Sequence, residues 1–347
     1  MIHVDKTAVV ILNWNGIEYL RTFLPTVVSC SERTDVKVVV ADNGSTDGSV
    51  AWIQKNFPEL ALIRFKKNYG FTGGYNRALK RVKADYYVLL NSDVEVTPGW
   101  LEPLEQVLDT QPTVAACSPK IKSYQNKENF EYAGAAGGCI DYFGYPFCYG
   151  RVLKSIEKDT GQYEQSRDVF WVSGACMLVR AELYHRYGGL DTDFFAHMEE
   201  IDLCWRLQNE GFRLSYVPQS EVFHVGGGAL PNESPRKLFL NYRNNLLMLY
   251  KNLPEKILLR VLISRMLLDG MSAIVYLASG KFSYFTAVCK AHGDFYHRLP
   301  AYRSKRKMAQ SYRGRLHYVG YYRGSLLWAY FIKRVRLALS LNPEMLG

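Results

Sequence analysis

The sequence predicts an α/β protein with a mostly parallel central sheet, helices flanking that sheet, and a helical, basic C-terminal extension. Two observations in the first 120 residues predict the sheet. Short Val- and Ile-rich runs alternate with helical stretches, and polar turns follow three of these runs. A third observation, a run of basic residues near the C-terminus, predicts the extension.

Four nearly continuous apolar runs are typical of strands that are buried on both faces of a sheet. They cover residues 7–12, 36–41, 61–65 and 85–90. Helices are expected at 16–29, 49–56, 74–82 and 100–110. This alternation is typical of βαβ units, which pair their strands in parallel.

The later elements are expected from shorter patterns. Residues 168–179 are expected to form one strand with a kink at Ser173-Gly174, and residues 213–217 and 221–225 two short strands. Residues 181–187 and 199–211 are expected to be helical, as are several stretches after residue 236. The Gly- and Tyr-rich stretch 120–167 gives no clear pattern. The Gly- and Pro-containing stretch 226–235 is expected to be a loop, either a lid over the donor or a plain connector.

The polar turns at 13–16, 42–45 and 91–93 follow the first, second and fourth runs. Ordinary turn chemistry explains each of them singly, but explains their coincidence less well. Because parallel α/β sheets bind ligands beyond the carboxyl ends of their strands, we expect a ligand site there.

Two residues at strand ends suit a divalent cation. Asp93 follows a buried strand, with Asn91 on the same face, and His224 ends another short strand. Carboxylate and imidazole ligands, completed by water and phosphate oxygens, suit Mg²⁺ or Mn²⁺. A structural histidine is the alternative for His224.

Three acids open the helix expected at 199–211. Glu199 and Asp202 share one face, whereas Glu200 is rotated away by about 100°. Mutual repulsion would raise a pKa and suit a general base. The alternative is compensation of the helix dipole by acids in its first turn.

Seven motifs in order make residues 7–250 resemble the family 2 glycosyltransferases of the GT-A fold, in the rhamnosyltransferase-like branch that builds bacterial surface polysaccharides. The motifs are VVILNWNG (9–16), VVVADNGSTDGS (38–49), NYGFTGGYN (68–76), LLNSDV (89–94), VSGACMLVR (172–180), GGLDTDFFAHMEEIDLCWR (188–206) and VFHVGGG (222–228). One of them alone would be weak, but seven in sequence are specific.

The resemblance implies a donor site for a nucleotide-activated sugar, in which Asp42 reads the nucleobase edge. It also implies that Asp93, the last acid of the family's DxD motif, binds a Mg²⁺ or Mn²⁺ ion together with His224. Asn91 replaces the first acid of that motif, as members of this branch often show. The nucleotide- and donor-binding residues implied are Asn13, Asn15, Asp42, Asn68, Gly70, Asn76, Asn91 and Ser92.

The catalytic base implied by the resemblance is Glu200, where the family has the Asp of a Glu-Asp pair. Glu for Asp is a departure from the family pattern that keeps the carboxylate, and Glu199 and Asp202 remain alternatives. The residues implied to approach the acceptor are Trp171, Ser173 and Gly174.

The formal charge of +10 is confined to the C-terminal end. Residues 295–347 contain eleven Lys and Arg against one acid, whereas residues 1–294 balance. Basic residues mixed with Tyr and Trp are typical of a membrane interface, and also of single-strand nucleic-acid binders. We expect an anionic membrane as the partner and no nucleic acid. Residues 256–277 are expected to be a packed helical hairpin or an interfacial helix, but not a spanning one.

Seven scattered cysteines without a CxxC motif, and an N-terminus without a signal pattern, favour a reducing cytosol. We therefore expect a cytoplasmic enzyme, peripheral on the cytosolic face of the membrane. Residues 1–250 are expected to be the catalytic domain, with a nucleotide-binding half (1–120) and an acceptor half (121–250). Residues 251–347 are expected to form the helical, basic region.

The activity expected is inverting transfer of a sugar from a nucleoside diphosphate, with dTDP-L-rhamnose favoured and a UDP-sugar next. The acceptor expected is a lipid-linked glycan or an oligosaccharide. Two alternatives stay open. A sugar nucleotidyltransferase would need a Gly-rich basic loop where this chain has NWNGIEY, and an inactive binding protein would explain Asn91 and Glu200.

Overall fold

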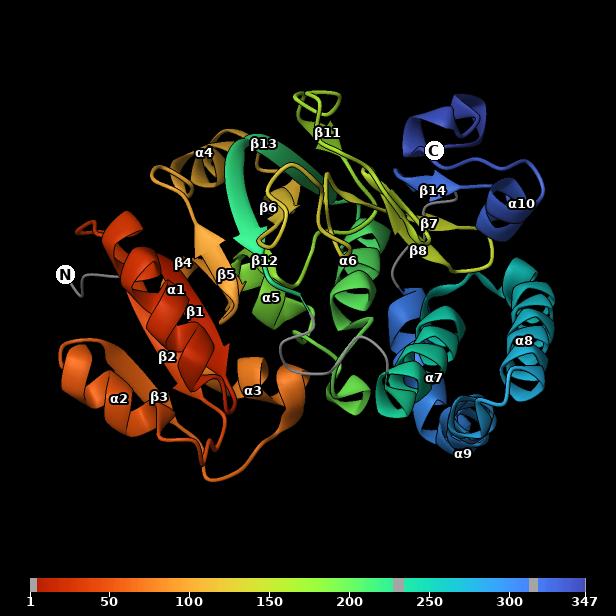
Figure 1. Ribbon diagram of the computed structural model, residues 1–347, viewed down its shortest axis with the longest axis horizontal. Helices are drawn as coiled ribbons and strands as arrows, with labels where there is room; N and C mark the ends of the chain where they lie inside the picture. The colour runs from red at the N-terminus through yellow and green to blue at the C-terminus, as the bar shows by residue number, and fades with distance from the viewer. Residues whose placement is uncertain (1–4, 227–233, 312–317, 347) are drawn as a thin grey trace.

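The computed structural model describes residues 5–226, 234–311 and 318–346. The molecule contains a mixed central sheet of nine strands, and helices cover both faces of this sheet (Figure 1). Its strands are β1 (Asp5–Asn13), β2 (Val36–Asp42), β3 (Ala61–Arg64), β4 (Ala84–Asn91), β5 (Val94–Val96), β6 (Val114–Ser123), β11 (Arg167–Asp168), β12 (Cys176–Arg180) and β13 (Arg213–His224). This architecture confirms the α/β fold class.

Helices alternate with the strands of the first half, as the sequence predicts. They are α1 (Ile17–Cys30), α2 (Ser49–Asn56), α3 (Gly70–Leu79) and α4 (Glu102–Thr110). Strands β3, β2, β1 and β4 pair in parallel, in that order, and the interiors of β1 and β4 are apolar and buried, whereas the edge strand β3 is only partly buried. The register places Asn13 beside Asp42 and Leu12 beside Asn91, so the polar turns that follow these strands meet at one edge.

The second half of the central sheet is partly antiparallel. Strand β12 runs antiparallel to both β4 and β6, its two neighbours. The single strand expected at 168–179 is wrong, because β11 pairs with β13 and the chain crosses to β12 over residues 169–175. Trp171 in that crossing forms a bridge with Gly138 in the second sheet.

Residues 213–224 form one long strand, β13, instead of the two short ones expected. A bulge between Val217 and Glu221 keeps the strand paired with β6 on both sides of the irregularity. Because its last residues also pair with β5, His224 lies opposite Val94. Helices α5 (Ala181–Arg186) and α6 (Glu199–Asn209), with a 3₁₀ turn at Thr192–Phe194, come between β12 and β13.

The stretch 120–167, which gave no sequence pattern, contributes most of a second sheet. Its strands are β7 (Gly138–Asp141), β8 (Pro146–Cys148), β9 (Arg151–Val152), β10 (Ser155–Ile156) and, from the C-terminus, β14 (Tyr321–Tyr322). Strand β14 pairs in parallel with β7. The C-terminal segment therefore completes a sheet that begins near the middle of the chain.

Three long helices lie at the lower right of Figure 1. They are α7 (Pro235–Asn252), α8 (Glu255–Ala278) and α9 (Phe282–Ser311), and they are followed by α10 (Leu326–Phe331) and 3₁₀ turns at Ala338–Ser340 and Pro343–Met345. Helix α7 packs along α9, and α6 packs against α7. The division at residue 250 stays a prediction, and it falls within α7. Most of the loop expected at 226–235 lies outside the described residues.

Candidate functional site

Asn13 and Asp42 meet at the carboxyl ends of β1 and β2, as the register requires. The Asn13 amide donates to Asp42 Oδ2 and to Ser45 Oγ, each at 3.1 Å, and both residues are at most 2% exposed. Asn13 Oδ1 has no partner. Asn15 adopts a left-handed conformation, with φ 50°, and accepts from Thr46 N at 2.8 Å. This corner therefore offers a buried carboxylate and a free amide oxygen to a polar ligand.

A turn that precedes α3 lies beside this corner. Asn68 Oδ1 accepts from Gly70 N at 2.7 Å and from Asn43 Nδ2 at 3.0 Å. Gly70 has φ +75°, and a Cβ there would come within 2.5 Å of the Phe195 ring, so glycine is required. Sequence reasoning missed Asn43, a buried residue of the DNGS turn whose side chain also accepts from Tyr69 N at 3.1 Å.

Asn76 was predicted to contact the donor, but its side chain is bonded within the protein. Its amide donates to Leu190 O at 2.7 Å, and its Oδ1 accepts from Tyr184 Oη at 2.6 Å and from Leu190 N at 3.1 Å. These contacts tie α3 to the segment before α6. They favour a positioning role for Asn76.

Asp93 and His224 lie together, with a second acid behind the histidine. His224 Nε2 is 3.2 Å from Asp93 Oδ1, and His224 Nδ1 is 3.5 Å from Glu131 Oε1. Burial alone would lower the pKa of His224, but Glu131 and Asp93 raise it to about 10. Asn91 Nδ2 lies 3.5 Å from the same Nε2 atom. Glu131 is a residue that sequence reasoning missed, since it lies in the unpatterned stretch.

The donor set fits a divalent cation that a ligand helps to bind. No group of three or more His, Cys, Asp or Glu side chains forms a metal site by itself in residues 5–226, 234–311 and 318–346. Asp93 and His224 nevertheless present one carboxylate oxygen and one imidazole nitrogen toward the same point. Phosphate oxygens and water would complete such a site. The binding would release the His224 proton, because a metal binds the neutral imidazole.

Glu199 and Glu200 begin α6 directly after a strained turn. Phe195, His197 and Met198 all have positive φ, between 65° and 72°. Burial raises the pKa of Glu200 to about 7. Burial, and then the charge of Glu200, raise the pKa of Glu199 well above its usual range. One oxygen of each carboxylate lacks a hydrogen-bond partner. Glu200 can therefore take up or release a proton near neutral pH.

A side chain of helix α7 forms hydrogen bonds to the backbone of this strained turn. The fully buried Asn244 amide donates to the carbonyls of Phe194, Ala196 and His197 at 2.8–2.9 Å. Its Oδ1 accepts from Arg243 Nε at 2.9 Å. Backbone strain of this kind persists only when surrounding contacts impose it. Asn244 lies outside every motif, so sequence reasoning missed it.

Asp202, a predicted alternative base, is bonded to three buried partners. Its Oδ2 accepts from Lys251 Nζ at 2.7 Å and from Arg206 Nε at 3.0 Å, and its Oδ1 accepts from Asn252 Nδ2 at 2.8 Å. The side chain is not exposed. These contacts favour a structural role.

The three predicted acceptor residues lie in the crossing that precedes β12. Trp171 is 2% exposed and donates to Cys139 O at 2.9 Å, so its ring belongs to the core. Ser173 Oγ donates to Ala133 O at 2.8 Å and is also buried. Gly174 faces the base, because a Cβ there would lie 3.6 Å from Glu200 Cβ.

Backbone contacts join these parts into one site. Asn91 N donates to Ala175 O at 2.9 Å, which places the Gly174–Glu200 pair beside the end of β4. A Cβ on Gly16 would lie 2.6 Å from Asn13 Oδ1 and 3.4 Å from Ser92 Oγ, which places Ser92 beside the Asn13 corner. The Asp42 corner, the Asp93–His224 pair and Glu200 therefore surround one region at the carboxyl edge of the sheet.

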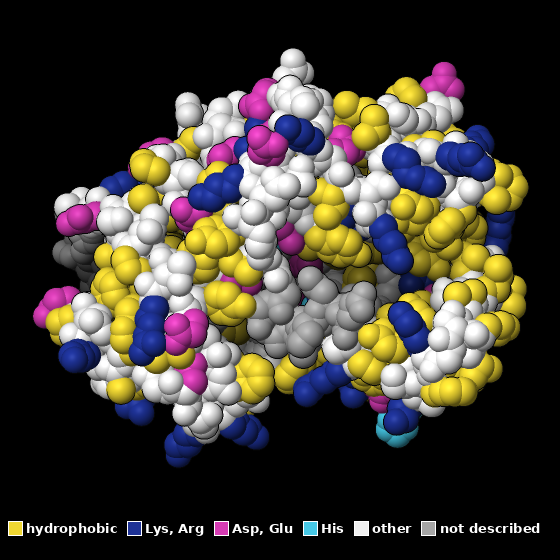
Figure 2. All heavy atoms as spheres, viewed as in Figure 1, with side chains coloured by type: hydrophobic (Ala, Val, Ile, Leu, Met, Phe, Trp, Pro, Cys, Tyr) yellow, Lys and Arg dark blue, Asp and Glu magenta, His cyan; other side chains and the backbone are white. Residues whose placement is uncertain are grey.

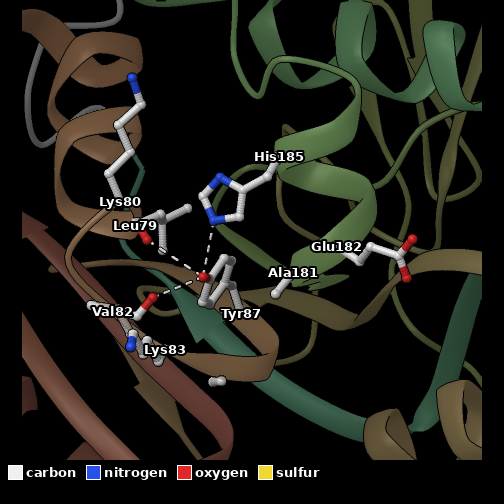
Figure 3. A pocket seen from close by; sticks show the side chains of 9 residues that line it. Leu79, Lys80, Val82, Lys83, Tyr87, Ala181, Glu182 and His185 are labelled. Carbon is white, nitrogen blue, oxygen red and sulfur yellow. Dashed lines mark hydrogen bonds between the residues drawn. The ribbon is translucent and has the colours of Figure 1, made fainter.

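A separate shallow hollow lies toward the opposite end of β4 (Figure 3). Its lining includes Leu79, Lys83, Ala84 and Tyr87 and no predicted site residue. The Tyr87 hydroxyl donates to Val82 O at 2.9 Å and lies 3.0 Å from His185 Nε2. The hollow is therefore not part of the carboxyl-edge site.

Comparisons with known proteins identify relatives of this chain. Residues 8–188 match the family model described as glycosyl transferase family 2. An N-acetylglucosaminyl-diphospho-decaprenol L-rhamnosyltransferase of Mycobacterium tuberculosis is 29% identical over 238 residues, which are 63% of this chain and 76% of that protein. A pre-mycofactocin glycosyltransferase of the same organism is 28% identical, over 68% of this chain and 46% of the relative.

Solved structures share the fold. GalNAc-T7, crystallised with UDP, GalNAc and Mn²⁺, aligns with a TM-score of 0.56 at 15% identity, over 72% of this chain and 48% of its own. A Pyrobaculum calidifontis mannosyltransferase in complex with GDP-Man and Mn²⁺ aligns with a TM-score of 0.51 at 15% identity, over 89% of this chain and 85% of its own. These neighbours confirm the GT-A fold class.

Proposed function

This chain belongs to glycosyl transferase family 2, and from that premise we propose that it is an inverting, metal-dependent enzyme with a nucleoside-diphosphate sugar as donor. The donor proposed first is dTDP-L-rhamnose, followed by a UDP-sugar. The similarity to a rhamnosyltransferase supports that order. The observation that carries the proposal is the convergence of the Asp42 corner, the Asp93–His224 pair and Glu200 at one edge of the sheet.

The chemistry proposed is one displacement. Glu200 accepts the proton of an acceptor hydroxyl while that oxygen forms a bond to the anomeric carbon of the donor. The bond from this carbon to the diphosphate oxygen breaks, and the nucleoside diphosphate leaves with the electron pair. Attack from the side opposite the leaving group inverts the anomeric configuration. Burial, and then the charge of Glu200, raise the pKa of Glu199, which disfavours a state in which both carboxylates carry charge.

Asp93 and His224 would hold the divalent cation, which supplies positive charge to the leaving diphosphate when bound. Asp42 and Asn13 are proposed to bind the nucleobase side of the donor. A buried carboxylate that accepts a hydrogen bond from Asn13 at 3.1 Å is well placed to accept another from a base N–H group. Asn15, Asn68, Gly70, Asn91 and Ser92 are proposed to shape the remainder of the donor site.

The acceptor proposed is a glycan hydroxyl, most simply on a lipid diphosphate, as part of surface polysaccharide synthesis. The name of the mycobacterial relative describes a lipid diphosphate as its acceptor, and the basic C-terminal region of this chain suits an anionic membrane. A peripheral position on the cytosolic face of the membrane is part of this proposal.

Titration calorimetry with UDP, dTDP, GDP and CMP, each with and without Mn²⁺, tests the donor site. We expect one nucleoside diphosphate to bind in a Mn²⁺-dependent manner, and Asp93→Ala to abolish that dependence. Glu200→Gln should bind the same nucleotide as wild type, because its side chain acts on the acceptor. A folded wild-type chain that binds none of the four would overturn the proposal and favour an inactive relative of the family.

A further inference from the structure

We propose that the outer stripe of α8 and the segment 328–339 form one surface that rests on an anionic phospholipid membrane. This inference deepens the proposed function, because it identifies the part of the chain that would meet the membrane carrying the acceptor. By length and composition alone, α8 is the one helix within the described parts of the chain that could cross a membrane.

Helix α8 has one packed stripe and one exposed apolar stripe. The buried stripe faces the protein and consists of Leu258, Val261, Leu262, Arg265, Asp269 and Ala273. The outer stripe, at helical spacing, consists of Leu259, Ile263, Leu267, Met271, Ile274 and Val275, which are 51–70% exposed. At 1.5 Å per residue this stripe is about 24 Å long. An exposed apolar face of this size needs a partner.

A second apolar group lies on the same side of the molecule. Trp328, Phe331 and Ile332 of α10 and its C-terminal end are 57–66% exposed, and Leu337 and Leu339 are 50% and 56% exposed. Figure 1 places α8 and α10 at the same edge of the molecule, and Figure 2 shows hydrophobic side chains interspersed with Lys and Arg along that edge. The two groups can therefore meet one surface together.

Basic side chains accompany this apolar surface. Lys333, Arg334 and Arg336 are exposed between the apolar residues of the second group, and Lys256 and Arg260 are exposed in the first two turns of α8. Lys and Arg near a membrane surface strengthen binding through attraction to anionic lipids. Two copies of this chain meeting through the same face would instead bring like charges together, so charge favours lipid over self-association.

The buried stripe argues for a helix lying in the interface and against a spanning helix. Arg265, 5% exposed, donates to Asp269 Oδ1 at 2.8 Å and to Asn245 Oδ1 at 2.6 Å. His292 on α9 is 3.3 Å from Asp269 Oδ2. Crossing a membrane would pull this buried ion pair away from its partners, which costs several kcal/mol. With its inner stripe packed, α8 can insert only its outer side chains.

This arrangement would hold the active site at a fixed height above the lipid. Arg265 binds Asn245, and the preceding residue, Asn244, binds the turn that presents Glu200. The membrane face and the proposed base are thus linked through adjacent residues of α7. A lipid-linked acceptor would meet an enzyme that is already oriented.

Vesicle co-sedimentation of the full chain tests the inference without donor, acceptor or turnover, so its result is independent of the proposed catalysis. The probes are phosphatidylglycerol-containing vesicles and pure phosphatidylcholine vesicles. The variant is Ile263→Glu/Leu267→Glu, which places two acids on the outer stripe. The matched control is Ala51→Glu/Gln54→Glu, two exposed positions on α2 at the opposite side of the molecule.

We expect wild type and the α2 control to bind anionic vesicles more tightly than neutral ones, and salt to weaken that binding. The α8 variant should lose at least about tenfold in vesicle affinity, because two acids replace inserted apolar groups. The inference is overturned if wild type does not sediment with anionic vesicles at low salt, or if the α8 variant binds like the control. It is also overturned if wild type is a dimer that the α8 variant separates and neither protein binds vesicles.

Discussion

At the scale of single residues, Glu200 should determine the pH dependence of sugar transfer. Its carboxylate must be ionised to accept a proton, and burial raises its pKa to about 7. The ionised fraction therefore grows as pH rises through 7, and kcat should fall about tenfold per pH unit well below that value. Rates measured across this range, with dTDP-L-rhamnose or the donor that binds, check the expectation.

Glu200→Gln should reduce kcat by at least about a hundredfold. It should also remove the fall of kcat that wild type shows below pH 7. Glu182→Gln, an exposed acid on α5, is the matched control and should match wild type. Wild-type turnover by Glu200→Gln would show that another group is the base, and Glu199 would be the next candidate.

Glu131 should act as a positioning residue for His224. Its Oε1 lies 3.5 Å from His224 Nδ1, on the side of the ring opposite Asp93. Acidic groups behind a metal-binding histidine fix the ring orientation and raise its basicity. Glu131→Gln should therefore weaken Mn²⁺-dependent nucleotide binding by about tenfold to a hundredfold, with binding in the absence of metal unchanged.

Calorimetry of Glu131→Gln with and without Mn²⁺ separates this role from a general structural one. Glu128→Gln is the control, since its side chain is largely exposed and three residues away. An equal loss of binding with and without Mn²⁺ would contradict the positioning role, as would no loss at all.

At the scale of elements, α7 should fix the turn that presents Glu200. Asn244→Ala removes the side-chain donor of the Ala196 and His197 carbonyls and leaves Phe194 O with Arg243 Nη2 as its side-chain donor. The loss should lower the free energy of unfolding by about 1–3 kcal/mol. It should also reduce kcat at least tenfold and change donor KM less, because residues 196–198 of the turn lead directly into Glu200.

Asn241→Ala on the same helix removes one local bond to Lys237 O and serves as the control for that measurement. Thermal unfolding and steady-state kinetics on both variants check the expectation. If Asn244→Ala lost stability but kept wild-type kcat, the contact would be structural only.

The elements that the sequence predicted well are those specified by local pattern. Strands β1 to β4 are short apolar runs that alternate with helices along the chain, so residue type and spacing were sufficient to predict them. The second sheet could not be predicted in this way. Its strands have two to four residues, and β7 has β14 as a partner about 180 residues later. Pairing between segments so far apart in the sequence is not specified by any local pattern of residues.

The same reasoning separates the site residues that were found from those that were missed. Asp42 and Asn91 are the last residues of β2 and β4, at the carboxyl ends where ligands of parallel sheets bind. Glu131 and Asn244 contact residues that are distant in the sequence, and no local sequence pattern predicts those contacts. Trp171 shows the converse, because Gly138 leaves room for its ring within the core, and a residue implied to approach the acceptor is a packing residue.

At the scale of the whole molecule, buried ion pairs join the C-terminal helices to the catalytic half. Lys251 Nζ contacts Asp191 at 2.8 Å and Asp202 at 2.7 Å, and Lys305 of α9 contacts Asp191. Burial alone would raise the pKa of Asp191, but Lys251 and Lys305 lower it strongly. A carboxyl with a lowered pKa stabilises the fold above about pH 4, and this contribution is lost as pH falls further.

These contacts predict that residues 1–250 do not fold without the rest of the chain. Ending the chain after residue 250 removes Lys251 and Lys305 and leaves Asp191 and Asp202 buried without those cations, which costs about 3–5 kcal/mol for a broken buried pair. It also removes α9, which packs along α7, and β14, which completes the second sheet. Because domains are stable by only about 5–15 kcal/mol, we expect the shortened chain to be insoluble or to lack a cooperative thermal transition. The full chain with Ile263→Glu/Leu267→Glu is the control, since it changes only the exposed stripe of α8 and should unfold like wild type. A shortened chain that melts cooperatively and binds nucleotide would contradict the expectation and support an autonomous catalytic domain ending at residue 250.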